Sequence, residues 1–269
     1  MNSARSVPSE AVLAAFGVYD NPVILPGGQG RTWRAGQVVL KPVDFLPETL
    51  WRADVLSGLS KSSEFRVARP VRSREGGWVA DGWEAHELLA GQTDASRPDH
   101  VVPAGIAFHE AIAELPRPEF LDVRDDPWTY GDRVAWEEAP VEGSPPYRQL
   151  VAGLVEARRP VELRDQAVHG DLLGNVLFAD GLPPAIIDWP VYWRPSSWAS
   201  AVAVVDALCW YDAKPDLATR WSHLPEWGQM LLRALIYRVT TDDAVRGHWT
   251  PDHLDRYRPT IELALSFAR

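Results

Sequence analysis

The stretch that decides the fold reads VHGDLLGNVLF at residues 168–178, and IIDW follows it at residues 186–189. Together they place two acids, Asp171 and Asp188, and one amide, Asn175, on loops bordered by apolar, strand-like runs. Carboxylate and amide oxygens arranged in this way can hold magnesium and orient a hydroxyl group. The pattern predicts a phosphoryl-transfer site whose remaining parts must lie elsewhere in the chain.

The composition limits the class of protein. The chain has 269 residues, enough for one large domain or two lobes, and its 46% hydrophobic and 24% charged content is that of an ordinary folded protein. A net charge of −10 argues against a nucleic-acid partner, which would require a basic surface. It favours a small-molecule substrate, and a cationic one is electrostatically compatible.

The compartment is expected to be the cytoplasm. The single cysteine, Cys209, lies in the apolar run 199–211, where we expect a packed core thiol, and one cysteine forms no internal disulfide. No apolar run reaches the ~18 residues of a membrane span, so no membrane partner is expected. Residues 1–12 lack the apolar core of a signal peptide.

Hydrophobic periodicity predicts a β-rich first part and a helical second part. We expect strands at residues 38–43, 65–71 and 78–83. We expect helices at residues 9–16, 47–59, 101–115, 147–158, 198–211, 225–240 and 252–267. Residues 116–146, rich in proline, acids and tryptophan, are expected to be irregular.

A glycine-rich turn precedes the first long strand. Gly27, Gly28 and Gly30 permit positive φ and a close approach of the backbone to a phosphate, although an ordinary hairpin turn fits equally well. Lys41 follows inside the apolar run 38–43. A lysine there must be paired or extend to solvent, so it either reaches nucleotide phosphates or lies at the surface edge of a strand.

A phosphate-binding lysine of this kind needs a carboxylate on the next helix to orient it. Glu48 and Asp54 are both candidates. Helical phase favours Glu48, which shares a face with Trp51 and Val55, whereas Asp54 lies on the polar side. An acid near a helix N-terminus is also favourable simply through the helix dipole.

The acidic loops carry the remaining chemistry. Asp171 can accept a hydrogen bond from an attacking hydroxyl, Asn175 can offer an oxygen to a metal, and Asp188 can bind magnesium. Magnesium takes only one or two protein carboxylates, so this sparse set suits it better than zinc. We expect His169 to brace the loop through hydrogen bonds.

These residues, taken in order, resemble the aminoglycoside phosphotransferase family, one of the protein-kinase-like small-molecule kinases. The resemblance runs through residues 22–208 and includes ELLAG at 87–91, where the family has its interlobe hinge, and IAFH at 106–109. It implies an α+β, bilobal protein-kinase-like fold. A small antiparallel β-rich N-lobe would take residues 1–90 and a larger, mainly helical C-lobe residues 91–269.

The resemblance also implies roles for single residues. ATP and Mg²⁺ would bind between the lobes, with Gly27, Gly28, Gly30 and Lys41 at the phosphates. Backbone groups of His86, Glu87 and Leu88 would face the adenine. Asp171 would be the catalytic base, and Asn175 and Asp188 would hold the metal.

Two departures from the family pattern shape the functional hypotheses. Asn175 follows Asp171 by a step of four residues, where the family usually has five, and WPVYWRP at 189–195 replaces the family's small and acidic residues beside the acceptor site. The first hypothesis is an ATP-dependent phosphotransferase acting on a hydroxyl of a small molecule that the family does not identify. The alternative is a kinase-like nucleotide-binding protein with a regulatory role and little or no phosphotransfer.

The acceptor site is expected among the C-lobe helices and residues 128–136. Acids near this segment would suit a cationic acceptor, although a solvated acidic loop is the favoured explanation for them. They are Asp125, Asp126, Asp132, Glu137 and Glu138.

Overall fold

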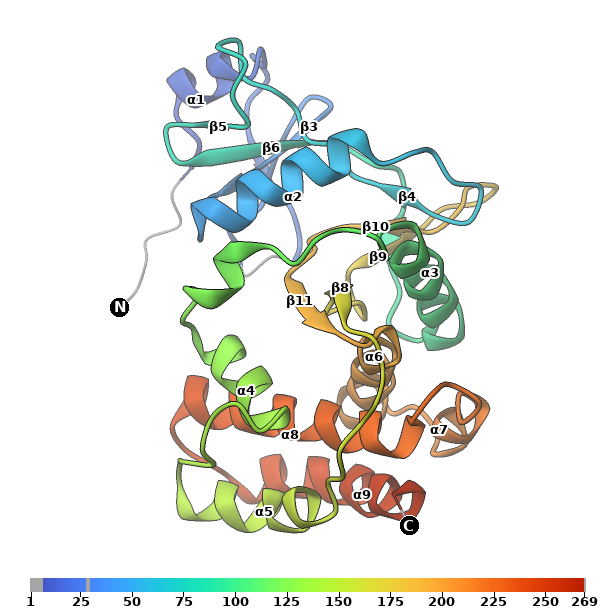
Figure 1. The fold of residues 1–269 in the computed structure, drawn as a ribbon. Coiled ribbons are helices and arrows are strands. Elements are labelled where there is room, and N and C mark those ends of the chain that lie inside the picture. Colours follow the sequence, from blue (N-terminus) through green and yellow to red (C-terminus); the bar gives the residue numbers. More distant parts are fainter. Residues whose placement is uncertain (1–6, 28–29, 269) are drawn as a thin grey trace. The chain divides into compact units, whose positions relative to one another are not determined.

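The computed structural model describes residues 7–27 and 30–268, and it divides into two compact units. The first unit comprises Met1–Gln92 and Leu177–Ile187, and the second comprises Thr93–Val176 and Asp188–Arg269. The first is built around an antiparallel sheet and the second mainly from helices (Figure 1). The α+β class predicted from the sequence is confirmed.

A five-stranded antiparallel sheet forms the frame of the first unit, in the order β1-β2-β3-β6-β5. Its strands are β1 (Val23–Ile24), β2 (Trp33–Ala35), β3 (Val38–Pro42), β5 (Val79–Ala80) and β6 (Trp83–Glu87). The apolar run of β3 places Leu40 in the core, opposite Ala85 of β6. Lys41 is the next residue, so its side chain leaves the opposite face of the sheet.

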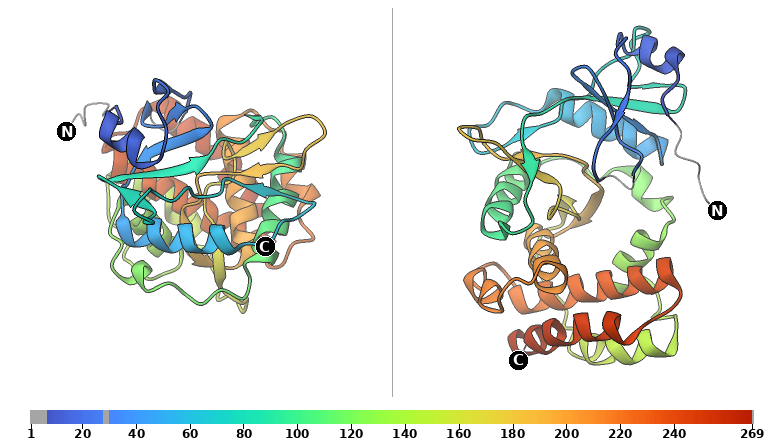
Figure 2. Two further views of the ribbon diagram at one scale, coloured as in Figure 1. Left: turned by 90° about the horizontal axis from the view of Figure 1, so that it is seen from above. Right: turned by 180° about the vertical axis from the view of Figure 1, so that it is seen from behind.

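Two helices accompany this sheet. Helix α1 (Glu10–Ala15) begins at Ser9, whose side chain caps the N–H of Val12, and it packs Val12 and Leu13 into the core with Leu40 and Trp83. Helix α2 (Leu46–Gly58) runs alongside the sheet in both views of Figure 2. It begins with a proline in its first turn, where the missing N–H costs no helical hydrogen bond.

A second, four-stranded sheet has the order β4-β10-β9-β7. Its strands are β4 (Arg66–Val67), β7 (Gln92–Thr93), β9 (Val176–Phe178) and β10 (Ala185–Ile186). Strand β10 pairs in parallel with β4, and the Arg66 guanidinium donates to the carbonyl of Pro183 over 2.8 Å. These bonds attach Leu177–Ile187 to the first unit, a segment that the expected division at residue 90 leaves in the second.

The second unit is a helical assembly with one two-stranded ribbon. Its helices are α3 (Pro98–Ala111), the short 3₁₀ helix η2 (Glu119–Asp122), α4 (Pro127–Ala135), α5 (Pro145–Glu156), α6 (Ser196–Trp210), α7 (Asp216–Arg220), α8 (Trp227–Arg246) and α9 (Pro251–Phe267). The ribbon pairs β8 (Gln166–His169) with β11 (Val191–Arg194). Helix α8 packs against α4, α5, α6 and α9 (Figure 1), and both α6 and α8 are buried on most of their circumference.

The expectation of an irregular segment at residues 116–146 is wrong in part, because η2 and α4 lie within it. The side chain of Asp126 accepts the N–H of Thr129, and Pro127 occupies the first turn of α4. The proline therefore starts a helix where the composition suggested that it would prevent one. Packing against α8 buries Val134 and Ala135 and stabilises this short helix.

Two sequence expectations concern the cysteine and the apolar helices. Cys209 is buried on α6, as expected of a core thiol, and burial raises the pKa of that thiol to about 12. Among the helices of the described residues, none combines the length and the apolarity required to cross a membrane.

Candidate functional site

The two acidic loops leave the same end of the β8–β11 ribbon. The antiparallel register pairs His169 with Val191, and the N–H of Gly170 donates to the carbonyl of Pro190 over 3.3 Å. Asp171 follows His169 by two residues, and Asp188 precedes Val191 by three. Residues separated by 17 positions in the sequence are therefore presented from one edge of one small ribbon.

Two buried histidines brace the loop. The backbone N–H of His169 donates to Nε2 of His109 over 3.0 Å, and the N–H of Asp171 donates to Nδ1 of His169 over 3.1 Å. Nε2 of His109 and Nδ1 of His169 each accept a hydrogen bond and so carry no proton, which makes both imidazoles neutral. Burial lowers the pKa of His109 to about 3, with His169 adding to the effect. The bracing role expected for His169 is confirmed.

Gly170 is required by close packing. A Cβ at this position would lie 2.3 Å from Cδ2 of Tyr192, whose ring covers the backbone of the loop. Tyr192 is itself fixed, because its hydroxyl shares a 2.9 Å hydrogen bond with the hydroxyl of Tyr237. Only glycine fits between His169 and Asp171 without displacing this aromatic ring.

Asn175 bonds directly to Asp171. Its Nδ2 donates to the backbone carbonyl of Asp171 over 2.7 Å and to Oδ2 of the same residue over 3.1 Å. The turn that brings the two together is closed by the N–H of Asn175 on the carbonyl of Leu172, and it uses a left-handed φ of +90° at Gly174. The shortened step of four residues thus places the amide on the carboxylate.

Asp188 has a φ of +50°, in the left-handed region that non-glycine residues seldom adopt. The next residue holds it there, because Nε1 of the buried Trp189 donates to the carbonyl of Val168 over 3.0 Å. The Trp189 ring also packs edge-on against Phe108.

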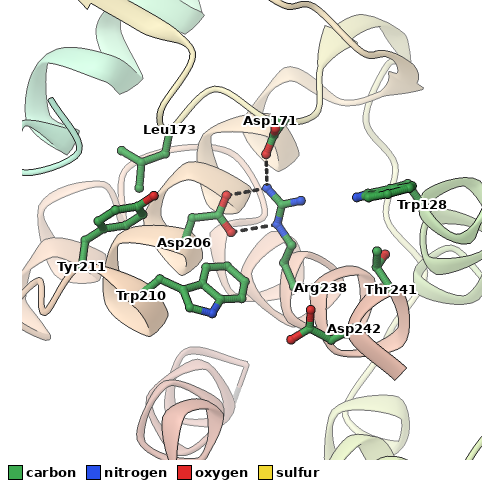
Figure 3. A pocket seen from close by; sticks show the side chains of 9 residues that line it. All are labelled: Trp128, Asp171, Leu173, Asp206, Trp210, Tyr211, Arg238, Thr241 and Asp242. Atoms are coloured by element: carbon green, nitrogen blue, oxygen red, sulfur yellow. Dashed lines mark hydrogen bonds and ion pairs between the residues drawn. The ribbon is translucent and has the colours of Figure 1, made fainter. Parts of the chain in front are cut away.

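A pocket of about 300 Å³ opens beside Asp171 within the second unit (Figure 3). It combines aromatic side chains with acids and one arginine. Its walls come from α4, the acidic loop, α6 and α8: Trp128, Asp171, Leu173, Asp206, Trp210, Tyr211, Arg238, Thr241 and Asp242. Trp128 and Tyr211 are 39% and 49% exposed, so both aromatic rings are available to a small molecule.

Arg238 joins two of the acids. Its Nη2 donates to Oδ1 of Asp171 over 2.6 Å and also to Asp206, while its Nε donates to Asp206 over 2.8 Å (Figure 3). Asp206 is buried on α6, and this burial outweighs the arginine and raises the pKa of Asp206 to about 6. The Asp171 side chain is 44% exposed.

Sequence reasoning missed both Arg238 and Asp206. A signal existed, because each is a charge inside an apolar helical run, AVAVVDALCW and LLRALIYRV, and buried charges are normally paired. The partner of each remained unknown, since 32 residues separate them. Trp210, Tyr211 and Asp242 were missed as well, for want of any local pattern.

Most of the acids expected near the acceptor have other partners. Asp132 and Glu138 both accept hydrogen bonds from Arg194, and Asp126 caps α4. Burial raises the pKa of Asp132 despite this arginine. Glu137 lies 3.7 Å from Arg233. From residues 128–136 it is Trp128 that lines the pocket.

In the first unit, the glycine turn has the expected form at its ends. Gly27 and Gly30 have φ values of +86° and +71°, and the N–H of Gly30 donates to the carbonyl of Gly27 over 3.0 Å. A Cβ at Gly27 would meet no atom within 4 Å, so the turn is open on that side. Gly28 lies outside the described residues.

Lys41 pairs across the sheet with Glu84 of β6. Burial alone would raise the pKa of Glu84, but Arg52, His86 and Lys41 together hold it well below its usual range. Arg52 donates to both carboxylate oxygens, over 2.9 and 3.0 Å. Glu84 is thus a third acid near the lysine, and the antiparallel register that brings it there cannot be read from either strand alone.

The two acids considered from the sequence differ in their surroundings. Asp54 accepts the indole N–H of Trp78 over 2.6 Å, an interaction that ties α2 to the segment before β5. Glu48 lies in the first turn of α2 and is 9% exposed. Asp54 is thus engaged by Trp78, and Glu48 is buried at the start of α2.

Some backbone N–H groups at the end of β6 already donate hydrogen bonds within the protein. The N–H of Glu87 donates to the carbonyl of Arg69 and that of Leu88 to the carbonyl of Gln37, over 2.8 and 2.9 Å. The imidazole of His86 lies 3.1 Å from Glu84. Along the described chain, Leu89 carries the first N–H after β6 that donates to no protein acceptor.

The donor set suits magnesium. No group of three or more His, Cys, Asp or Glu side chains that could hold a metal occurs in the described parts of the chain. Magnesium needs only one or two protein carboxylates and keeps several waters. Asp188 supplies a carboxylate, and because Nδ2 of Asn175 is committed to Asp171, the oxygen Oδ1 of Asn175 is the atom that can face a cation.

Comparison with known proteins gives structural matches alone. No protein-family model matches the sequence, and no curated protein matches it either. Among solved structures, choline kinase LicA from Streptococcus pneumoniae is similar, with a TM-score of 0.57 and 11% identity over 94% of this chain and 96% of LicA.

Two further structures extend the match. A thermostable mutant of aminoglycoside phosphotransferase APH(4)-Ia, in ternary complex with AMP-PNP and hygromycin B, has a TM-score of 0.59 and 14% identity over 96% of both chains. A choline/ethanolamine kinase family protein from Mesorhizobium loti has a TM-score of 0.52 and 16% identity over 94% of both. At these identities the likeness shows the fold. The protein-kinase-like fold predicted from the sequence is confirmed.

Proposed function

We propose that the protein is an ATP-dependent phosphotransferase that transfers the γ-phosphate to a hydroxyl group of a small molecule. The observation that carries this proposal is the position of Asp171, whose carboxylate lies in the wall of a 300 Å³ pocket and is held by Asn175. A small-molecule acceptor fits a pocket of this size. The similar solved structures include kinases of small molecules, one of them crystallised with hygromycin B and an ATP analogue.

In the proposed reaction, the oxygen of the acceptor hydroxyl attacks the γ-phosphorus, and Asp171 accepts the proton that this hydroxyl loses. The bond between that phosphorus and the β–γ bridging oxygen breaks, and ADP leaves. The protein contributes mainly by positioning the groups and by stabilising charge. Asp171 suits its part because its backbone is fixed by His169 and one carboxylate oxygen by Asn175.

Nucleotide binding is assigned to both units. In the first, the turn at residues 27–30, Lys41 and its orienting acid Glu48 bind the phosphates, and the N–H of Leu89 donates to the adenine. In the second, Asn175 and Asp188 hold Mg²⁺. Held by these two side chains, the ion would supply positive charge that stabilises the phosphates.

The acceptor is proposed to be cationic. Asp171, Asp206 and Asp242 line the pocket, Arg238 pairs with the first two and Arg246 lies 3.4 Å from the third, so three acids against two arginines leave one net negative charge. Trp128, Trp210 and Tyr211 add aromatic faces, which attract cations through the ring quadrupole. Amino alcohols and hydroxylated polyamines have this chemistry.

The test is a screen for ATP consumption, with ³¹P detection of a phosphorylated product, over amino alcohols, aminoglycosides, sugars and nucleosides. Product formed from an acceptor in this set supports the proposal. Nucleotide binding in a thermal-shift titration, without turnover on any acceptor, would support the alternative of a kinase-like regulatory protein.

A further inference from the structure

Arg238 connects the buried helices of the second unit to the loop that carries Asp171. It lies on α8 and is 9% exposed, and it is anchored by two hydrogen bonds to Asp206 of α6, which is 4% exposed. The same nitrogen that reaches Asp206, Nη2, also donates to Oδ1 of Asp171 over 2.6 Å. A fixed guanidinium is thus shared between a buried acid and a half-exposed one.

We infer that Arg238 is a positioning residue for Asp171, holding its carboxylate in the orientation from which it accepts a proton; this inference rests on the proposed phosphotransfer. Asp171 lies on a loop with its side chain 44% exposed, and Asn175 alone would fix one of its two carboxylate oxygens, so the carboxylate would keep rotamer freedom without Arg238. Because Arg238 is fixed between α6 and α8, its hydrogen bond restrains the Asp171 side chain.

The arrangement leaves Asp171 able to bind an acceptor. Oδ1 accepts a hydrogen bond from Arg238, and Oδ2 accepts one from Asn175. A carboxylate has about four lone-pair sites, so each oxygen retains one for a further donor such as a hydroxyl. Arg238 and Asn175 therefore fix the plane of the carboxylate without occupying it fully.

A second interpretation is that Arg238 only neutralises Asp206. A buried carboxylate without a counter-ion destabilises a fold, so Arg238→Ala alone lowers activity under either interpretation. The two differ in the double variant Asp206→Asn with Arg238→Ala, which removes both buried charges. If Arg238 serves only Asp206, this variant recovers the kcat of Asp206→Asn; if it positions Asp171, kcat stays low.

We expect Arg238→Ala and the double variant to show kcat reduced by ~10²-fold, with KM for the acceptor changed by about threefold or less, because a misplaced reacting group affects the transition state more than binding. Arg238→Lys, which keeps a donor cation, should recover part of the loss. Recovery of kcat in the double variant to the level of Asp206→Asn would overturn the inference.

Chemical rescue sharpens the test. The third guanidinium nitrogen of Arg238 points away from both acids and toward the Trp128 side of the pocket, so the space left by Arg238→Ala is reachable from solvent (Figure 3). Millimolar guanidinium should raise the kcat of Arg238→Ala in a saturable way, whereas urea, which is uncharged and of the same shape, should not. Equal effects of both would count against the inference.

Two controls accompany these measurements. Arg220→Ala removes an exposed arginine that pairs with Asp99 and Asp216, and it should keep wild-type kcat with or without guanidinium. Arg233→Ala removes a buried arginine of α8, the helix that also carries Arg238. Arg233 donates to Gln229 and to the carbonyl of Arg159. This variant should have lower thermal stability, and added guanidinium should not raise its kcat.

A readout without turnover separates this inference from the proposed function. Crystal structures of the wild type and the double variant should show Asp171 in one rotamer in the first and in several in the second. If the wild type transfers no phosphate, the proposed function fails, and an unchanged single rotamer in the double variant would independently refute the positioning role.

Discussion

The amide of Asn175 donates to the carboxylate of Asp171 over 3.1 Å and to its backbone carbonyl over 2.7 Å. The four-residue step between them, shorter than the family pattern, therefore leaves the two side chains in contact. Because one end of the amide is committed to Asp171, its oxygen is oriented away from that carboxylate. This relationship makes a metal role for Asn175 compatible with the shortened loop, and the first two predictions depend on it.

Asp171→Asn should abolish most phosphotransfer. The variant keeps the shape of the side chain and its bond to Arg238 but loses the base, so kcat should fall by ~10²–10⁴-fold while ATP affinity stays within about twofold. Asp180→Asn is the matched control, since Asp180 is an exposed acid outside the pocket. Equal activity of the two variants would remove Asp171 from its assigned role.

Asp188→Asn should weaken magnesium-dependent nucleotide binding. Calorimetric titration with ATP should show the wild type gaining affinity on addition of Mg²⁺ and the variant gaining little, because a neutral amide binds Mg²⁺ more weakly than a carboxylate. Affinity in the presence of EDTA should be the same for both proteins. A full Mg²⁺ effect in Asp188→Asn would show that the metal has other ligands.

Comparing Glu48→Gln with Glu84→Gln decides which acid orients Lys41. We expect Glu48→Gln to reduce ATP affinity with little change in thermal stability. Glu84→Gln should instead destabilise the first unit, because it removes the buried charge to which Arg52 donates two hydrogen bonds. Differential scanning calorimetry and nucleotide titration measure the two effects. The reverse pattern would assign the orienting role to Glu84.

His109 should make the protein sensitive to acid. Its pKa is about 3 in the folded chain, against 6.5 for an ordinary histidine, because it is fully buried. The unfolded chain therefore binds a proton below pH 6.5 that the folded chain does not, and stability falls as the pH falls through the window from 6.5 to about 3. This single group contributes a loss on the order of 1 kcal/mol per pH unit there.

Urea unfolding of the wild type and of His109→Gln between pH 7 and pH 4 checks this expectation. The amide oxygen of the glutamine can still accept the hydrogen bond from the N–H of His169. The variant should lose less stability than the wild type as the pH falls, although it starts lower at pH 7. Parallel stability curves for the two proteins would mean that His109 does not account for the acid sensitivity.

Trp128→Ala should raise KM for the acceptor. Trp128 is 39% exposed in the pocket wall, so the loss of stability should be small, whereas a cation–π contact of about 1 kcal/mol corresponds to roughly a fivefold change in KM. Trp128→Phe should keep part of the affinity. An unchanged KM in Trp128→Ala for every accepted substrate would place the acceptor elsewhere.

The sequence by itself determined the local parts of this protein. Apolar periodicity located β3, α2 and the C-terminal helices, since burial of one face dictates the spacing of apolar residues. Composition failed for α4, where capping by Asp126 and contact with α8 outweighed the prolines. The residues Lys41, Asp171, Asn175 and Asp188, in that order along the chain, carry part of the family resemblance that predicted the fold.

Tertiary structure alone decided how these parts act together. Arg238 meets Asp171 and Asp206 from positions 67 and 32 residues away, and Glu84 meets Lys41 through the register of two antiparallel strands. A buried charge reveals that it needs a partner, because burial without one is costly, but it does not reveal which partner. That choice follows from helix packing and strand pairing, which no local pattern of residues encodes.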